Sequence, residues 1–261
     1  MEKEDILVTI VTPSYNQGQF IEDTITSVLN QTYKNIQYIV VDGASTDNTM
    51  EVVERYRDKI DIVISERDKG QTDAINKGFK LAKGELVGWI NSDDMLYPYC
   101  VEEIVKLYKQ NPDGVIFYGS RVEMIDSKNN HIRFWDNHIK NRKRLLTKNY
   151  DVSQQGSFYK RDIVHKVNYL DESIYYCMDL DLFLKLLNFG DIYSIDDKPL
   201  AQFRLLEEAM TATGKAKFIK NIRERLYLHG AKIYNKSILK TYKLEFKFMC
   251  IDIIGRILRI R

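Results

Sequence analysis

The 261-residue sequence has few cysteines, prolines and glycines, and each shortage excludes a class of protein. Three widely spaced cysteines without a C-x-x-C pair argue against a disulfide scaffold or a structural zinc site, and they fit a reducing compartment. Four prolines and 13 glycines are too few for a collagen-like or linker-rich chain. The start, M-E-K-E-D-I-L-V, has no apolar run flanked by basic residues, so we expect no secretory signal.

The composition that is present is typical of a folded domain with an uneven charge distribution. Hydrophobic residues make up 44% and charged residues 29%, which is ordinary for a globular protein. The net charge is only +2, but residues 215–261 carry 13 basic and 3 acidic side chains. Residues 1–214 carry the remaining 26 basic and 34 acidic ones. We therefore expect an acidic body, 1–214, followed by a basic tail, 215–261.

Apolar, β-branched runs alternate with helical patterns in the first third of the chain. We expect strands at 6–11, 36–41, 60–64 and 85–90, and helices at 18–30, 47–56 and 70–82. Nearly continuous apolar strands separated by helices predict a mostly parallel sheet buried on both faces, which is an α/β, Rossmann-like fold.

The pattern is looser after Pro98. Helices are expected at 99–110 and 178–189, extended segments at 115–122, 131–135, 152–159 and 192–203, and helical structure from 215 to the end.

Polar residues follow each of the first four expected strands, where open parallel sheets bind their ligands. Asp42 either caps the following turn or accepts hydrogen bonds from a ligand, and the residues alone favour neither explanation. The adjacent carboxylates of Asp93 and Asp94 repel each other unless a cation such as Mg²⁺ or Mn²⁺ lies beside them. A solvated acidic turn is the alternative. Asp73 is equally well explained as a favourable charge at a helix start.

Several segments between Val8 and Pro98 resemble glycosyltransferase family 2, whose members have the GT-A fold. These segments are V-T-P-S-Y-N, S-V-L-N-Q-T-Y, V-V-D-G-A-S-T-D-N-T, D-K-G-Q-T-D-A-I-N-K-G and W-I-N-S-D-D. The resemblance implies a nucleotide-binding half at about 5–98, an acceptor-side half at about 99–214 and a C-terminal helical extension. It also implies a nucleoside-diphosphate sugar as donor, most simply a UDP-sugar.

The resemblance implies roles for residues of the first half. The nucleotide would be bound by the residues Pro13, Tyr15, Asp42, Asp68, Asp73 and Asp93. Asp93 and Asp94 would hold Mn²⁺ or Mg²⁺, which neutralises charge on the departing diphosphate. Trp89 and Asn91 would lie in the donor and acceptor pocket, and Asn91 stands where many family members have aspartate.

The second half supplies the expected general base. Y-C-M-D-L-D resembles the acidic motif at the start of the acceptor-side helix and aligns Asp179 with the catalytic aspartate, with Asp181 as the next candidate and part of the pocket. Either acid is also explained by the helix dipole. Gln155 and Gly156 resemble the segment that shapes the sugar pocket, and Arg204 resembles the arginine of an F-R-x-H element that meets the diphosphate. The histidine of that element falls near Leu206, and a closing loop is expected at 207–211.

Other enzyme classes lack their diagnostic motifs here. No G-x-G-x-x-G follows the first strand, no G-x-x-x-x-G-K-[ST] is present, and there is no glycine-rich basic loop of a nucleotidyltransferase. We therefore predict an inverting, metal-dependent transferase that adds a hexosyl or N-acetylhexosaminyl group to a glycan or lipid-linked acceptor in polysaccharide biosynthesis. A catalytically degenerate sugar-nucleotide-binding or scaffold protein remains the alternative.

The basic tail has two explanations. Its lysines recur on one helical face at 236, 240, 243 and 247, and apolar residues recur on another side at 244, 248, 251, 254 and 258. The tail either binds an anionic membrane surface as an amphipathic helix or packs its apolar side on the domain. We expect a cytoplasmic protein, peripheral at the inner face of the membrane in the first case, with no nucleic-acid partner. The oligomeric state is not predicted.

Overall fold

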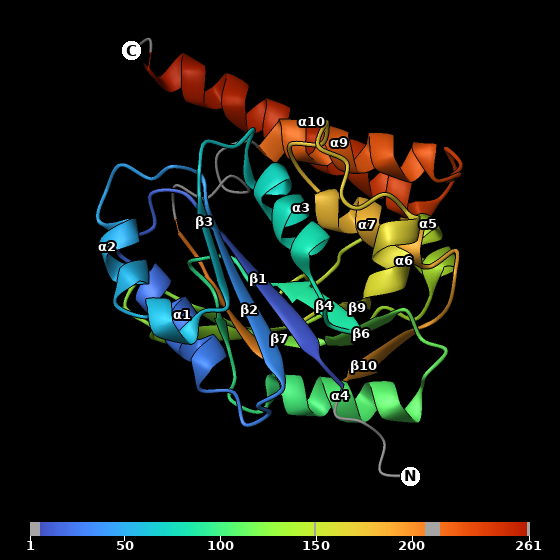
Figure 1. Cartoon of the computed structure of the whole chain (residues 1–261). Coiled ribbons are helices and arrows are strands. Elements are labelled where there is room, and N and C mark those ends of the chain that lie inside the picture. The colour runs from blue at the N-terminus through green and yellow to red at the C-terminus, as the bar shows by residue number, and fades with distance from the viewer. Residues whose placement is uncertain (1–5, 149, 207–214, 260–261) are drawn as a thin grey trace.

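The computed structural model describes residues 6–148, 150–206 and 215–259, and its larger sheet has seven strands in the order β10-β6-β9-β4-β1-β2-β3. These strands are β1 (Val8–Ser14), β2 (Ile36–Asp42), β3 (Ile62–Ser65), β4 (Leu86–Trp89), β6 (Ile116–Gly119), β9 (Phe158–Lys160) and β10 (Ile192–Ile195). Only β9 runs antiparallel to its neighbours, β4 and β6. The predicted mostly parallel α/β sheet is therefore confirmed (Figure 1).

Helices cover both faces of this sheet because its strands carry apolar side chains on both sides. Val8 and Ile10 belong to one buried cluster, whereas Val11 of the same strand belongs to the other. The first face is covered by α1 (Ile21–Leu29), α2 (Thr49–Glu54) and α4 (Cys100–Gln110). The second is covered by α3 (Gln71–Leu81), α5 (Arg142–Thr147), α6 (Arg161–Lys166) and α7 (Met178–Leu186). The helices predicted from periodicity are thus present, and each is shorter than expected at one or both ends.

A second, four-stranded sheet was not predicted from the sequence. It has the order β5-β11-β7-β8, with β5 (Met95–Leu96), β7 (Arg121–Ile125), β8 (His131–Asp136) and β11 (Ala201–Arg204). The extended segments predicted at 115–122 and 192–203 are each divided between the two sheets. The prediction of an extended segment over 152–159 was wrong for most of its length, because only Phe158 and Tyr159 of it lie in a strand.

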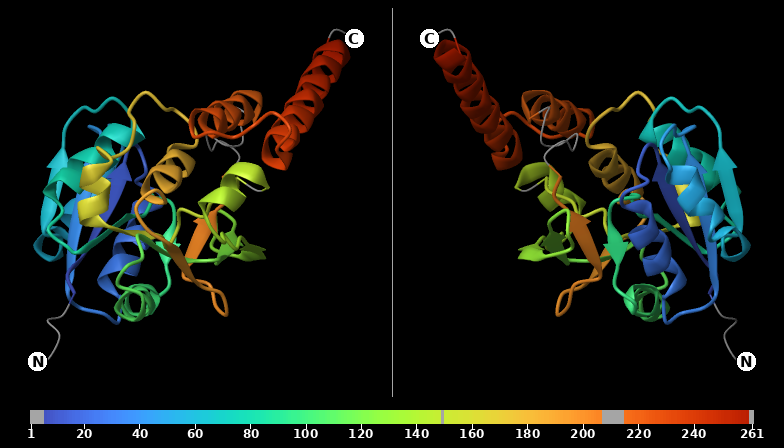
Figure 2. Two further views of the ribbon diagram at one scale, coloured as in Figure 1. Left: turned by 90° about the vertical axis from the view of Figure 1, so that its right-hand side faces the viewer. Right: turned by 90° about the vertical axis from the view of Figure 1, so that its left-hand side faces the viewer.

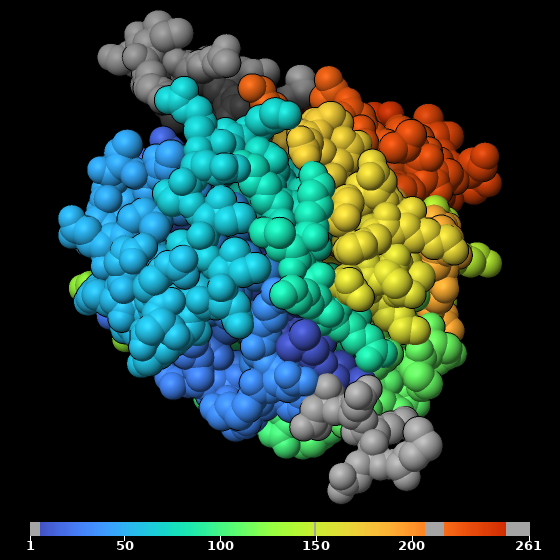
Figure 3. Space-filling model, viewed as in Figure 1, coloured from blue at the N-terminus to red at the C-terminus, as the bar shows by residue number. Residues whose placement is uncertain are grey.

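The loop after α6 lies against α3 on the second face (Figure 3). The buried amide of Asn76 holds this loop, because its Nδ2 atom donates to the carbonyl of Leu170 at 3.0 Å and its Oδ1 atom accepts from the N–H of Leu170 at 3.1 Å. This contact fixes the chain that leads into α7 against the helix that follows β3.

The basic tail forms two helices, α9 (Lys215–Leu228) and α10 (Lys236–Arg259), as predicted. Ile222, Leu226 and Ile238 are buried in the core cluster shared with α3 and α7. The N-terminal part of the extension therefore packs on the domain, whereas the end of α10 extends beyond the body (Figure 2). Among the residues described, no helix combines the length and apolar character needed to span a bilayer.

Candidate functional site

The loops after β1 and β2 are bonded to each other at the carboxyl edge of the sheet. The N–H of Asn16 donates to the Oγ atom of Ser45 at 2.8 Å, and the Oδ1 atom of Asn16 accepts from the N–H of Thr46 at 2.8 Å. Tyr15, which directly precedes Asn16, is 58% exposed, so its ring is accessible to a ligand.

Asp42 is fully buried and its carboxylate is bonded within the protein. One oxygen accepts from the N–H of Ser45 at 3.0 Å and from the hydroxyl of Ser65 at 2.8 Å, and the other accepts from the hydroxyl of Ser45. These contacts stabilise the turn after β2, as expected for a capping aspartate. They do not by themselves point to a ligand.

Asp68 lies against the same turn, because Gly43 leaves room for it. A Cβ atom at Gly43 would lie 2.6 Å from the Oδ2 atom of Asp68, so any side chain there would displace this carboxylate. The other oxygen of Asp68 accepts from the N–H of Gly70 at 2.8 Å. The carboxyl edge of the sheet therefore presents the half-buried carboxylate of Asp68 after β3 and the exposed ring of Tyr15 after β1.

Three other residues expected at the site have mainly structural contacts. The carboxylate of Asp73 accepts from the N–H of Lys69 at 3.0 Å and lies 3.6 Å from the ammonium of Lys77, at the start of α3. Pro13 is buried within β1. The ring of Trp89 packs in the core, with centroid distances of 5.9 Å to Phe79 and 5.7 Å to Tyr159.

The turn between β4 and β5 holds the paired carboxylates. Asp94 is fully buried, and its oxygens accept from the N–H of Arg204 at 2.9 Å, the amide of Gln155 at 3.1 Å and the amide of Asn91 at 3.2 Å. Burial and the neighbouring charge of Asp93 nevertheless raise the pKa of Asp94 well above its usual value. Burial also raises the pKa of Asp93. Two carboxylates that resist ionisation together form a site that a cation would stabilise.

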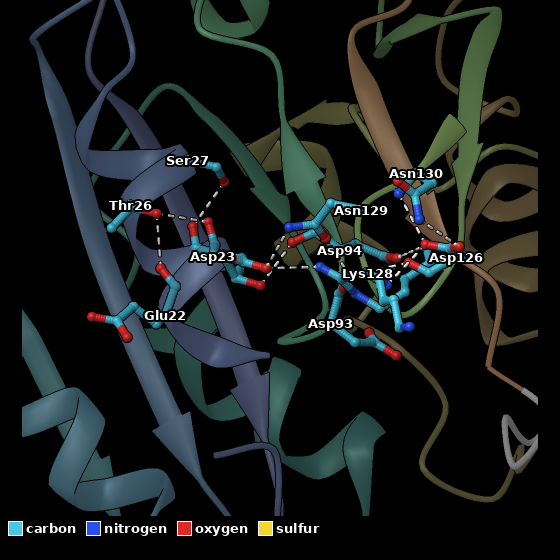
Figure 4. A network of polar contacts seen from close by, with 12 residues as sticks. Glu22, Asp23, Thr26, Ser27, Asp93, Asp94, Asp126, Lys128, Asn129 and Asn130 are labelled. Atoms are coloured by element: carbon cyan, nitrogen blue, oxygen red, sulfur yellow. Dashed lines mark hydrogen bonds and ion pairs between the residues drawn. The ribbon is translucent and has the colours of Figure 1, made fainter. Parts of the chain in front are cut away.

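Arg204 is almost completely buried and connects its own strand, β11, to three other segments of the chain. Its guanidinium donates to the carbonyls of Asp93 at 2.8 Å and Asp126 at 3.2 Å, to the side chain of Asp23 at 3.1 Å and to that of Asn129. Figure 4 shows Asp23, Asp93, Asp126 and Asn129 converging from α1, the β4–β5 turn and the β7–β8 turn. The described contacts of this guanidinium are thus all with the protein, and they fix the position of the Asp93–Asp94 turn.

The first turn of α3 connects this acidic turn to the start of α7. The amide of Gln71 donates to the Oδ1 atom of Asn91 at 2.8 Å, while the hydroxyl of Thr72 donates to the sulfur of Met178 at 2.9 Å. Asp179 follows Met178 directly. The acidic turn and the start of α7, which carries Asp179, therefore both contact the first turn of α3.

Asp179 lies in the first turn of α7 and is half-buried. Its Oδ1 atom accepts from the N–H of Leu180 at 2.8 Å, and burial raises its pKa above the usual range of aspartate. Burial and the charge of Asp179 raise the pKa of Tyr159 in β9. A carboxylate with a raised pKa is a suitable general base.

Asp181 has a different environment from that of Asp179. It is 1% exposed, and its two oxygens lie 2.9 Å from the Nε2 atom of His229 and 2.8 Å from the Nζ atom of Lys185. Burial would raise its pKa, but these two hydrogen bonds outweigh burial and lower it. Asp181 is therefore an anchor for the C-terminal helices.

The remaining expected residues lie near the acidic turn or outside the described part. Gln155 contacts Asp94, as noted, and Gly156 has a positive φ of 72° in the same loop. Leu206 follows β11 and is half-buried. The closing loop predicted at 207–211 lies outside the described residues. Many metal ions in proteins are held by a group of at least three His, Cys, Asp or Glu side chains. The described residues contain no such group.

The model of a known protein family matches residues 9–167, and its description is glycosyl transferase family 2. The chain belongs to this family. Over 221 residues it is 31% identical to an uncharacterised glycosyltransferase of Rickettsia typhi, covering 79% of this chain and 66% of that relative. Over 91 residues it is 40% identical to TuaG of Bacillus subtilis, named for teichuronic acid biosynthesis, covering 34% of this chain and 36% of the relative. The chain thus spans at most two thirds of these family members.

Solved structures show the GT-A fold of the family. S. aureus TarS, solved with UDP-GlcNAc, matches with a TM-score of 0.68 at 17% identity, covering 94% of this chain and 72% of that one. The mannosyltransferase PcManGT from Pyrobaculum calidifontis, solved with GDP-Man and Mn²⁺, matches with a TM-score of 0.67 at 17% identity, covering 92% and 70%. The GT-A fold expected for this chain is therefore confirmed.

Sequence reasoning missed the residues that hold the acidic turn in place. Gln71, Asp23 and Asn129 are ordinary polar residues in the sequence, and only the fold brings them to Asn91 and Arg204. The signal for Gln71 was present, because it lies within the D-K-G-Q-T-D segment that resembles the family. Asp23 and Asn129 carried no such signal.

Proposed function

We propose that this protein is an inverting, metal-dependent glycosyltransferase that moves a sugar from a nucleoside-diphosphate sugar to a hydroxyl group. The observation that supports this most is the position of Asp179. Its carboxylate has a raised pKa and lies in the first turn of α7. The first turn of α3 contacts both the start of α7, through Met178, and the Asp93–Asp94 turn, through Asn91. A base and an acidic turn on one edge are what this reaction needs.

The acidic turn fits a hard divalent cation, Mn²⁺ or Mg²⁺. Its donors are carboxylate oxygens, and none of the described side chains donates a hydrogen bond to Asp93. Asp94 keeps acceptor capacity, since a carboxylate has about four lone-pair sites and three donors reach it. Asp93 and Asp94 would hold the metal, which would stabilise negative charge on the leaving diphosphate. The Mn²⁺ in PcManGT supports this assignment.

The nucleotide would bind along the ends of β1, β2 and β3. Tyr15 offers an exposed ring for stacking on a nucleobase, and Asp68 offers a carboxylate that can accept from the base or the ribose. Asp42 and Asp73 would act indirectly, by fixing the turn and the helix start that carry these groups. The UDP-GlcNAc bound by TarS makes a UDP-sugar the first donor to test.

Asp179 would act as the general base. Its carboxylate would take the proton of the acceptor hydroxyl while the acceptor oxygen bonds to the anomeric carbon. The bond from that carbon to the diphosphate oxygen breaks on the opposite face, so the configuration at the anomeric carbon inverts. The donor and acceptor pocket would include Asn91, Gln155 and Gly156.

The acceptor would be a glycan or a lipid-linked glycan of polysaccharide biosynthesis, which the name of TuaG supports. A lipid-linked acceptor would bring the enzyme to the cytoplasmic face of a membrane.

A donor screen tests this function. Thermal unfolding is followed with UDP-GlcNAc, UDP-glucose or GDP-mannose, each with Mn²⁺ or with EDTA, and release of the nucleotide is measured by chromatography. A bound donor stabilises the fold by mass action, so one donor should raise Tm only when Mn²⁺ is present. Release of nucleotide that Asp179→Asn abolishes supports the enzyme. Binding without release by the native chain supports a degenerate sugar-nucleotide-binding protein.

A further inference from the structure

Helix α10 has an apolar stripe that faces away from the domain. Leu239, Tyr242 and Phe246 are 52%, 43% and 70% exposed. Their spacing of three and four residues places them on one side of the helix. Exposed apolar side chains that occur singly need no explanation, but a continuous stripe of them does.

This stripe is separate from the side of α10 that packs on the domain. Ile238 and Thr241 are fully buried, and Leu244 and Phe248 pack against the core cluster. At about 100° per residue, these four lie on a side distinct from the exposed stripe. The packing that the sequence allowed for the tail therefore occurs, yet it leaves Leu239 and Phe246 exposed. Tyr242 is partly covered, because the guanidinium of Arg223 in α9 lies 4.2 Å from its ring centroid.

A row of lysines lies beside the exposed stripe. Lys236, Lys243 and Lys247 are all exposed, and helical geometry places them next to Leu239, Tyr242 and Phe246 rather than on the packed side. The outward half of α10 is thus part apolar and part basic. A helix face that contacts only water is usually polar along its whole length, unlike this one.

The connection into α10 adds to this surface. Leu228 ends α9 at 67% exposure, and Ile233 and Tyr234 follow at 64% and 75%. Figure 2 shows α9 and α10 together at one side of the molecule, with the end of α10 extending beyond the body. We name these six exposed apolar residues and the three lysines the α10 surface.

We propose that the α10 surface binds an anionic lipid bilayer, with α10 lying in the plane of the headgroups. The charge distribution supports this occupant, because residues 215–261 carry a charge of +10 and the remainder carries −8. Lysines would attract anionic headgroups while the aromatic and aliphatic side chains enter the boundary with the acyl chains. This binding surface is separate from the catalytic site, so it stands or falls independently of the proposed transfer reaction.

Vesicle sedimentation with the full chain tests the proposal. Vesicles of phosphatidylcholine alone are compared with vesicles that also contain phosphatidylglycerol. We expect at least about tenfold stronger partition onto the anionic vesicles, because the lysines of the α10 surface are attracted to anionic headgroups. Leu239→Ser with Phe246→Ser should reduce this partition strongly, and Lys236→Gln with Lys243→Gln and Lys247→Gln should abolish the preference for anionic lipid.

A matched control carries Ile132→Ser and Phe134→Ser on β8, two apolar residues of similar exposure, 47% and 40%, outside the α10 surface. This control should partition like the native chain. Unchanged Tm in each variant shows that the fold is intact. Equal binding to both vesicle types, or full binding by the Leu239→Ser and Phe246→Ser variant, would overturn the proposal. Light scattering gives a further test. The proposal would also be overturned if the native chain were a dimer, the Leu239→Ser and Phe246→Ser variant were a monomer, and the two bound vesicles equally.

Discussion

The Nε2 atom of His229 lies 2.9 Å from the Oδ1 atom of Asp181, and this contact joins the end of α9 to the first turns of the helix that carries Asp179. Lys185 bonds the other oxygen of Asp181 at 2.8 Å. The C-terminal extension and the proposed catalytic helix are therefore held together by one buried carboxylate. Two consequences for stability can be measured.

Replacing Asp181 by asparagine should destabilise the protein. The substitution leaves the charge of Lys185 without its buried partner, and breaking a buried pair costs about 3 kcal/mol or more in the free energy of unfolding. Urea denaturation measures this loss. Glu224→Gln is the matched control, because Glu224 pairs with Lys220 on the surface of α9 at 3.8 Å, and its loss should cost less than about 1 kcal/mol. Equal effects of the two substitutions would contradict the anchoring role.

The same pair predicts how stability depends on pH. The pKa of Asp181 is lowered in the folded state despite its burial, so its contribution is complete above the ordinary aspartate pKa of about 3.9 and is lost as the pH falls through the lowered value. The difference in unfolding free energy between the native chain and Asp181→Asn should therefore be constant near neutral pH and shrink in acid. A difference that grows below pH 4 would refute this assignment.

Asp179 should determine the acid limb of the rate profile. Burial raises its pKa, and a general base works only when ionised, so the rate of transfer should rise with pH through a value above that of ordinary aspartate. Asp179→Asn should lower kcat by about 10²–10⁴-fold, with little change in the KM for donor. Steady-state kinetics with the donor found in the screen measures both quantities. Asp171→Asn, outside α7, is the control and should keep the native profile. A normal kcat for Asp179→Asn would assign the base to another residue.

The parallel sheet could be predicted because its strands are buried on both faces and read as continuous apolar runs. The small sheet could not. The predicted segment 192–203 forms β10 in one sheet and β11 in the other, and the partners of β11 are Met95–Leu96 and Arg121–Ile125, about eighty or more residues away in the chain. The segment 192–203 is divided by strand pairing with distant parts of the chain, and such pairing leaves no pattern in the local sequence.

The polar ends of the strands also indicated the edge of the sheet where we propose the site, but not the contacts that each side chain makes within the protein. Asp42 and Arg204 were both expected to contact the donor, and the structure adds that each side chain also holds a turn in place through several hydrogen bonds within the protein. A buried arginine needs several acceptors, and those of Arg204 lie up to 181 residues away from it in the chain. The sequence contains these acceptors without showing that they meet.

Gln155 should be required for metal affinity although it is not a proposed ligand. Its amide donates to the Oδ2 atom of Asp94 at 3.1 Å and so orients that carboxylate. Loss of such a partner typically lowers metal affinity by about 10–100-fold, and Gln155→Leu should do so in calorimetric titrations with Mn²⁺. Gln154→Leu, which instead removes a donor to the carbonyl of Trp89, is the control. Equal Mn²⁺ affinity for the native chain and Gln155→Leu would disprove this role.

Gly43 should act on donor binding through Asp68. A Cβ atom at position 43 would lie 2.6 Å from the Oδ2 atom of Asp68, so Gly43→Ala must displace that carboxylate from the place where the nucleotide is proposed to bind. We expect Gly43→Ala to weaken donor binding about tenfold, and Asp68→Ala to weaken it by a similar factor. If both act on the same contact, the double variant should bind no more weakly than Asp68→Ala alone, because the effects of neighbouring residues are not additive. Titration of the four proteins with donor and Mn²⁺ measures the coupling. Fully additive losses would mean that Gly43 affects the nucleotide site by another route, such as the adjacent turn at Asp42.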